Sequence, residues 1–271
     1  MQHQEFEPPE ELQDTIKCFW YNRKDSGEIE SSFEVQPDGY AEIIFYFGSL
    51  RISYDGGLQE LPSPFMMGLL NQPVDFYTKN RLDIIGIRCF PWTVFDLLGL
   101  PSGKYGVRIF EHPIARLQSA LNKSIQAGGI DAALAQVKQY FLDVRSRVAI
   151  DSMLFKAGVA MREANGSMPV SQVAAAAHAT VRTLERKFRQ SSGYTVKDVS
   201  GLMRFEQVRN QLWHYPNSNI AGLAHELGYT DQSHLSREFK RYSGTTPAAF
   251  ARKAKKRKQA VGNDFVAFIQ A

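Results

Sequence analysis

The stretch that decides the fold is Ile220–Phe250, IAGLAHELGYTDQSHLSREFKRYSGTTPAAF. Gly228 ends a first short helix here, and Thr230 or Asp231 can cap the next one with a side-chain oxygen. The second helix has an apolar stripe on one side and a polar, cationic face on the other, which is the pattern of a helix-turn-helix motif. In the first helix, apolar residues follow the i, i+3, i+4, i+7 spacing of one helix face: Ile220, Leu223, Ala224 and Leu227.

The same pattern occurs a second time, 50 or 51 residues earlier in the chain. The upstream helices match at an offset of 50 and the downstream helices at 51, so the second copy has one extra residue in its turn. A repeat with this register is much harder to obtain by chance than one motif, and it predicts two helix-turn-helix units. The matching pairs include Val173 with Leu223, Ala174 with Ala224, Leu184 with Leu235, Arg186 with Arg237, Phe188 with Phe239, and Gly193 with Gly244.

Charge divides the 271 residues into two parts. Residues 1–150 hold 14 Lys and Arg against 19 Asp and Glu, a net of −5, whereas residues 151–271 hold 18 against 9, a net of +9. The basic part is suited to a polyanion such as DNA. The length favours two domains, and we expect a domain over 1–150, a DNA-binding domain over 151–258 and a tail over 259–271.

The N-terminal domain is predicted to be β-rich, followed by a helical hairpin. Short aromatic and β-branched runs over residues 15–92 favour a barrel or sandwich, and Asp38-Gly39 and Asp55-Gly56-Gly57 are candidate hairpin turns. Two amphipathic helices, Pro113–Ala127 and Ile130–Arg147, follow. Their apolar stripe could be buried on the β domain or on a second subunit. With an all-α C-terminal domain, the predicted fold class is α+β.

The C-terminal domain is predicted to be entirely helical. We expect a helix over Asp151–Glu163, the first helix-turn-helix over Pro169–Gln190, and a long helix over Thr195–Trp213 that links the two units. A dense cationic run, ARKAKKRKQA, begins at Ala251, and such a run is usually a solvated tail.

Nothing in the sequence favours a membrane or an oxidising compartment. No run of about 18 apolar residues occurs, and the acidic, polar first residues do not have the pattern of a secretory signal. Cys18 and Cys89 cannot define a disulfide framework and are expected to be small buried residues. These observations indicate a cytoplasmic protein.

Residues 155–253 closely resemble the DNA-binding domain of AraC/XylS-type bacterial transcription regulators. The resemblance covers both copies, represented by TLERKFRQSSGYT and GLAHELGYTDQSHLSREFKRYSGTTPAAF, and the helix between them. The segments Pro37–Gly48 and Leu82–Pro91 are similar to a β-rich sensor-type domain of unknown ligand that some of these regulators carry. The first copy departs from the pattern at Ala174–His178, AAAAH, where the family often has a glycine in the turn.

The polar face of each second helix is the face that a recognition helix presents to the major groove. In the first copy we expect Val181, Leu184 and Phe188 inside, with Thr180 as the cap. Arginine can bind guanine bidentately, glutamate can accept from cytosine and glutamine suits adenine, while Arg189 and Lys240 suit phosphates. From these chemistries and from the family's base-contacting positions, the predicted DNA-binding residues are Arg182, Glu185, Arg186, Arg189, Gln232, Ser233, Ser236, Arg237 and Lys240.

The sequence therefore favours a transcription regulator that is not an enzyme and needs no cofactor or metal. The expected partners are double-stranded operator DNA, RNA polymerase, a small-molecule effector and a second copy of the chain. One alternative is an enzymatic, repair-type N-terminal domain, although His3 and His112 form no pair with metal-ligand spacing. Another is an N-terminal domain that serves protein contacts only. Its aromatic set, which includes Phe33, Phe45 and Phe76, suits either a ligand pocket or, more commonly, a core.

Overall fold

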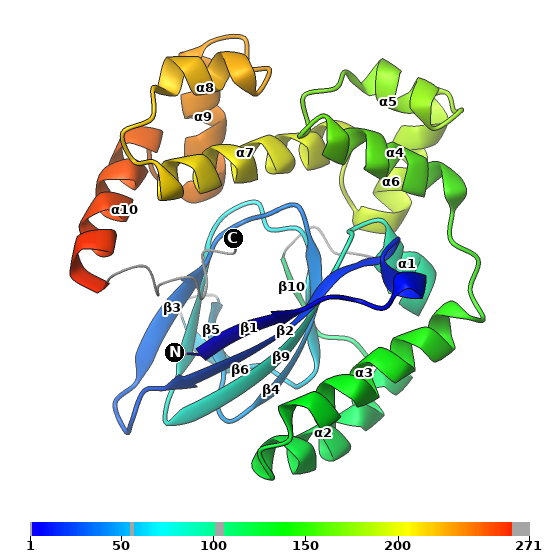
Figure 1. The fold of residues 1–271 in the computed structure, drawn as a ribbon, viewed down its shortest axis with the longest axis vertical. Coiled ribbons are helices and arrows are strands. Elements are labelled where there is room, and N and C mark those ends of the chain that lie inside the picture. Colours follow the sequence, from blue (N-terminus) through cyan, green and yellow to red (C-terminus); the bar gives the residue numbers. More distant parts are fainter. Residues whose placement is uncertain (1, 55–56, 101–105, 262–271) are drawn as a thin grey trace. The chain divides into compact units, whose positions relative to one another are not determined.

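A computed structural model of the chain describes residues 2–54, 57–100 and 106–261. These residues divide into two compact units. Unit 1 holds most of the chain up to Asp151, and unit 2 begins at Ser152 and also includes the short segments Val35–Gly39 and Leu70–Pro73. Unit 1 is β-rich with a helical hairpin and the chain from Ser152 onward is all-helical, so the predicted α+β fold class is confirmed (Figure 1).

The strands of unit 1 form two sheets. The sheets lie open rather than closing into a barrel, because β1 and β10 are edge strands among the described residues. The larger sheet has the order β1 (Gln2–Phe6), β2 (Ile16–Asp25), β9 (Arg81–Cys89), β4 (Ala41–Phe47), β7 (Phe65–Met67) and β10 (Val107–Arg108). The smaller sheet has the order β3 (Ser31–Val35), β8 (Val74–Thr78), β5 (Arg51–Tyr54) and β6 (Gly57–Glu60).

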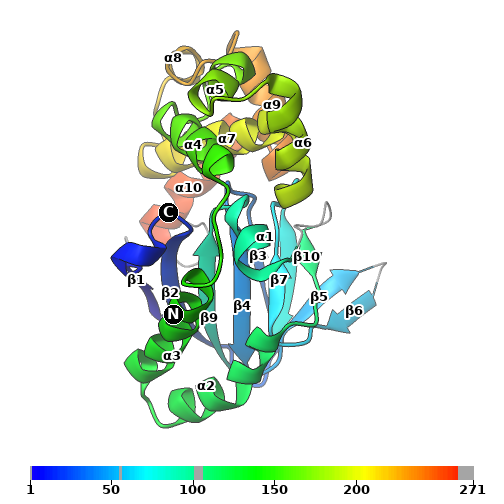
Figure 2. The same ribbon diagram turned by 90° about the vertical axis from the view of Figure 1, so that its right-hand side faces the viewer.

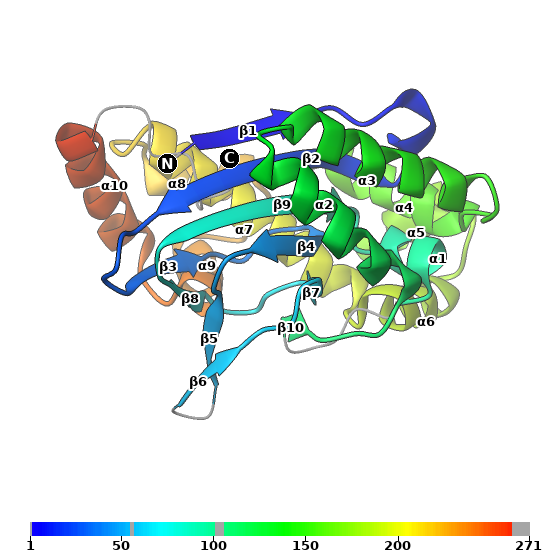
Figure 3. The same ribbon diagram turned by 90° about the horizontal axis from the view of Figure 1, so that it is seen from below.

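The helical hairpin covers one face of the larger sheet (Figure 3). It consists of α2 (Leu117–Gln126) and α3 (Ile130–Arg145), preceded by the 3-10 turn η2 (Pro113–Arg116). Side chains alternate across a strand, so Phe19 and Ile85 face the helices and join Leu121 and Phe141 in one buried cluster. The rings of Phe19 and Phe141 are 6.3 Å apart. The apolar stripe of the hairpin is therefore buried within the unit.

The remaining elements of unit 1 are short. A 3-10 turn η1 (Glu10–Leu12) precedes β2, and a short helix α1 (Thr93–Leu98) follows β9. Phe45 and Phe76 of the aromatic set are buried in the core, and so are three further aromatic residues of this domain: Phe65, Phe90 and Trp92.

Both cysteines are buried, as expected. Burial raises the pKa of the Cys18 thiol to about 12, and it raises that of Cys89 as well. A thiol with so high a pKa holds almost no thiolate at neutral pH and is a poor nucleophile.

The hairpin turn predicted at Asp38-Gly39 is wrong. This pair joins β3 to β4, and these strands lie in different sheets, so the segment is a crossover. The other predicted turn falls at residues 55 and 56, outside the described residues. The strands beside it, β5 and β6, pair antiparallel with Tyr54 opposite Gly57.

The helices of unit 2 are arranged around α7 (Val196–His214), which links the two helix-turn-helix units. Figure 1 shows α5 (Val170–Ala176) and α6 (Val181–Ser192) at one end of α7, and α8 (Ile220–Glu226) and α9 (Gln232–Ser243) at the other. Two further helices, α4 (Ser152–Glu163) and α10 (Pro247–Val261), complete the unit.

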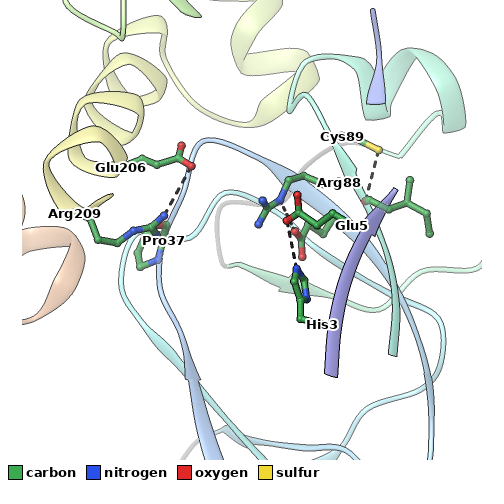
Figure 4. Close-up of polar contacts among 9 residues, drawn as sticks. His3, Glu5, Pro37, Arg88, Cys89, Glu206 and Arg209 are labelled. Carbon is green, nitrogen blue, oxygen red and sulfur yellow. Dashed lines mark hydrogen bonds and ion pairs between the residues drawn. The ribbon is translucent and has the colours of Figure 1, made fainter. Parts of the chain in front are cut away.

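Two features of the sequence hold α7 in place. Thr195 and Asp198 form a reciprocal capping box at its N-terminus. Near its other end, Arg209 is fully buried and donates to the backbone oxygen of Pro37 at 2.9 Å, inside unit 2 (Figure 4).

The predicted cationic run lies within α10 as far as that helix is described. Ala251 and Ala254 are buried, while Arg252, Lys253 and Lys255 are exposed, so the run forms a solvated helix face. The tail predicted for 259–271 falls outside the described residues from 262 onward. None of the described helices has the length and apolar content that crossing a bilayer needs.

Candidate nucleic-acid interface

The turns of the two helix-turn-helix units have the same backbone geometry. Four residues separate α5 from α6 and five separate α8 from α9, which confirms the extra residue predicted from the repeat. In both turns one residue is left-handed, His178 with φ 51° and Gly228 with φ 72°. The residue after it closes the turn with a 2.9 Å backbone bond, from Ala179 to Ala174 and from Tyr229 to Ala224. The missing glycine therefore leaves the first turn intact, since histidine is among the side chains that tolerate this conformation.

Side chains cap both recognition helices. Thr180 accepts a hydrogen bond from the backbone of Thr183 at 3.2 Å, and Asp231 accepts one from His234 at 2.7 Å. The bond from His234 holds the pKa of Asp231 below its usual value, so this cap is ionised at neutral pH. Both helices end at a left-handed glycine, Gly193 and Gly244.

The inner faces of α6 and α9 are fixed by large apolar side chains. Leu184 and Phe188 of α6 are fully buried, and Leu235 and Phe239 of α9 are almost completely so. Phe239 lies against Phe205 of α7, with ring centroids 5.0 Å apart. Because the inner face of each helix is occupied, its opposite face is turned outward.

The predicted DNA-binding residues lie on these outer faces. In Figure 2, where α7 is viewed close to end on, α6 and α9 lie toward the same side of it. Glu185 and Ser236 are partly exposed, and the other predicted residues are exposed: Arg182, Arg186, Arg189, Gln232, Ser233, Arg237 and Lys240. Each set therefore occupies one accessible face of its helix.

The placement of Val181 in the buried stripe is wrong, because 43% of its surface is exposed. It is the first residue of α6, directly after the Thr180 cap, and the packed face of the helix begins at Leu184. The offset of 51 residues places Val181 opposite Gln232, which the sequence assigns to the outer face. That register is the signal from which the position of Val181 could have been found.

The sequence also gave no indication of the role of Arg204 in α7. Its guanidinium donates to the backbone oxygen of Gly166, just after α4, at 2.8 Å. It also binds both carboxylate oxygens of Glu238 in α9, at 3.0 and 3.2 Å, and lies 5.1 Å from the ring centre of Tyr229 in the second turn. One side chain thus connects the linker helix, the end of α4 and the second recognition helix.

Unit 1 contains a cleft of about 570 Å³ between α2 and the ends of β4 and β9. Among the residues that line it are Arg81, Asp83, Gln118 and Asn122. Burial alone would raise the pKa of Asp83, but hydrogen bonds from Tyr21, Arg23 and Arg81 outweigh it and hold that pKa below its usual value. Of these charged groups, Arg81 and Asp83 line the cleft, so their charges offset each other there.

Comparisons with known proteins agree with this geometry. Residues 173–253 match the family model of a helix-turn-helix domain, and residues 4–109 match that of a domain of unknown function. Over 82 residues the chain is 30% identical to the HTH-type transcriptional regulator RipA of Corynebacterium diphtheriae. That match covers 30% of this chain and 24% of RipA, so the chain spans about a quarter of the length of this relative.

Solved structures with a similar fold include whole regulators and isolated DNA-binding domains. Fatty-acid-bound ToxT from Vibrio cholerae is 11% identical, with 88% of this chain and 96% of that chain covered and a TM-score of 0.48. The DNA-binding domain of AdpA, in complex with a target DNA, is 22% identical, with 40% and 96% covered and a TM-score of 0.37. An AraC-type regulator from Chromobacterium violaceum is 19% identical, with 38% and 91% covered and a TM-score of 0.35. These likenesses concern the fold alone.

Unit 2 therefore contains a double helix-turn-helix DNA-binding domain. This domain is of the AraC type, as the sequence resemblance implied. None of the proteins named above is described as an enzyme. Among the described residues, no three His, Cys, Asp or Glu side chains gather where they could hold a metal ion.

Proposed function

We propose that this chain is a sequence-specific transcription regulator of the AraC type, whose C-terminal domain reads two successive major grooves of operator DNA. The observation that carries the proposal is the pair of helix-turn-helix units with matching turns and caps on one linker helix. Each helix-turn-helix presents an accessible face rich in Arg, Lys and hydrogen-bonding side chains. Faces of this kind suit both the phosphates and the base edges of a duplex.

Individual roles follow from the chemistry of each side chain. Arg182, Arg186 and Arg237 can bind guanine O6 and N7 bidentately. Glu185 can accept from cytosine N4, and Gln232 can pair with adenine, with Ser233 and Ser236 adding hydrogen bonds beside them. Arg189 and Lys240, nearer the C-terminal ends of the helices, are assigned to phosphates, which position the protein without reading sequence.

Replacing Arg186 or Arg237 by alanine is expected to weaken binding to the preferred site by about 1–3 kcal/mol and to relax specificity at one base pair. Both side chains are exposed, so thermal stability should change little. Sites selected from a random DNA pool by the wild type and by each variant provide the measurement. Arg147→Ala, which removes an exposed arginine from unit 1, is the matched control. Unchanged information content in the sites selected by both variants would contradict the assignment.

For unit 1 we propose that it senses a small molecule at the cleft lined by Arg81 and Asn122. A cleft of this volume is within the usual range for ligand sites, and the guanidinium of Arg81 and the amide of Asn122 can donate hydrogen bonds to a small polar metabolite with a carboxylate. A ligand that binds only the folded state raises the melting temperature. We expect such a metabolite to stabilise the wild type and to have no effect on Asn122→Leu.

The alternative for unit 1 is that it serves protein contacts only, including self-association. No thermal shift across a panel of carboxylate metabolites would favour this alternative over sensing. Sedimentation velocity over a range of protein concentrations would then show whether the contact is with a second copy of the chain.

A further inference from the structure

We infer that Val181 is a specificity residue of the first recognition helix and that it contacts the C5 methyl group of a thymine in the major groove. The inference rests on the proposed function, because it requires α6 to enter that groove. It assigns a role to a side chain that the sequence pattern had placed in the core.

The position of Val181 supports a base contact. It is the first residue of α6, and the N-terminal residues of a recognition helix are those that contact base edges. Arg182 follows it directly, and Glu185 lies four residues on, which is one turn further along the same side of the helix. Its counterpart in the second helix-turn-helix is Gln232, which is exposed at the first position of α9.

Packing within the protein does not account for Val181. With 43% of its surface exposed, it differs from Leu184 and Phe188, which are fully buried. A hydrophobic staple is not its role either, because that contact would join Ala179, the residue before the cap, to Leu184. A single exposed apolar residue is common on protein surfaces. This one differs because its neighbours on the same side of the helix, Arg182 and Glu185, belong to the proposed reading face.

The chemistry of the side chain selects the base. Thymine carries an apolar group, its C5 methyl, at the major-groove edge, whereas the other bases offer hydrogen-bond donors and acceptors there. The side chain of valine has no hydrogen-bonding group, and its β-branch restricts it to one main rotamer in a helix, so little entropy is lost on contact. Val181 is therefore suited to thymine at the position where Gln232 is suited to adenine.

Replacing thymine by deoxyuridine removes the methyl group and leaves base pairing unchanged, which isolates the proposed contact. The full-length wild type is first used to select its preferred sites, and each thymine in the first half of the site is then replaced in turn. We expect one replacement to weaken wild-type binding about four-fold, the value of one buried methyl-sized group. Val181→Ala should bind the original site more weakly by a similar factor and be insensitive to that replacement.

Two further variants of Val181 test the base preference and the role of the methyl groups. Val181→Gln should shift the preferred base at that position from thymine toward adenine, which is the base that Gln232 suits in the second helix-turn-helix. Val181→Thr keeps one methyl group and should retain part of the sensitivity to deoxyuridine. All three variants should melt at the wild-type temperature, because the side chain is exposed.

Different results would contradict the role of Val181 and the proposed function of the chain. If Val181→Ala shows the same loss on deoxyuridine replacement as the wild type at every thymine, the assignment of Val181 is wrong. The same conclusion follows if no thymine in the selected sites is sensitive to its methyl group. If the wild type selects no sequence at all from the pool, it is the proposed function that is wrong.

Discussion

Arg204→Met is expected to destabilise the C-terminal domain by about 3–5 kcal/mol, which is the usual cost of removing one partner of a largely buried ion pair. Arg204 and Glu238 are only 13% and 14% exposed, so the variant leaves a poorly solvated carboxylate without its counter-ion. It also removes the bond to the backbone oxygen of Gly166. Methionine keeps most of the apolar stem, which restricts the loss to the guanidinium. Urea denaturation of the full chain measures the change.

The same substitution is expected to weaken DNA binding, although Arg204 lies on the linker helix and not on a reading face. Its partner Glu238 is largely buried, whereas Arg237 and Lys240 on the same helix are exposed. The planar guanidinium restrains the rotation of α9 about its axis, because Nη2 donates to both carboxylate oxygens of Glu238 while Nη1 donates to the backbone oxygen of Gly166. We therefore class Arg204 as a positioning residue.

Arg241→Met is the matched control, in the same domain and with the same chemical change. Arg241 is 60% exposed and lies 3.8 Å from Asp198, so this ion pair is solvated and should contribute no more than about 1 kcal/mol. Arg204→Lys keeps the charge without the fork and should recover stability more fully than DNA affinity. Equal losses of stability in the two methionine variants would show that Arg204 has no special role.

The parts of this fold that the sequence could predict are those determined by residues close together along the chain. The helices of the C-terminal domain follow from the 3.6-residue period of their apolar residues, from caps such as Thr180 and Asp231, and from terminal glycines. These signals lie within a few residues of each helix end. The internal repeat then placed the outer faces of α6 and α9, because two copies must present equivalent positions.

The parts that could not be predicted depend on contacts between distant residues. Asp38-Gly39 has the composition of a hairpin turn, but strand pairing decides whether a turn joins neighbours, and β3 pairs with β8 instead. Arg204 meets partners 34 and 38 residues away, which no period reveals. Val181 follows the apolar spacing of its helix, yet 43% of its surface is exposed. The burial of a side chain depends on contacts with other elements, which the spacing within one helix does not predict.

Gly86→Ala is expected to destabilise unit 1 by about 3–5 kcal/mol. Gly86 lies in β9, between Trp20 of β2 and Ile44 of β4. The indole of Trp20 is 5% exposed and lies directly over the glycine, so that a Cβ at position 86 would be 1.9 Å from its Cε2 atom. An overlap this deep cannot be relieved by small shifts, because protein interiors are close-packed. The ring must leave its site, at a cost similar to losing a buried aromatic side chain.

A double-mutant cycle separates this clash from any effect of alanine on the strand itself. In a Trp20→Ala background the space over position 86 is vacant, so adding Gly86→Ala should cost less than about 1 kcal/mol. The coupling between the two changes, which is the difference between the costs in the two backgrounds, should then be at least about 2 kcal/mol. Urea denaturation of the four proteins, followed by circular dichroism, gives each term. Costs for Gly86→Ala that are equal in both backgrounds would mean that the strand, and not the indole, requires glycine at this position. The expected result would instead show that position 86 requires glycine because the indole of Trp20 occupies the space above it. Only a residue without a side chain allows so close an approach to a central strand.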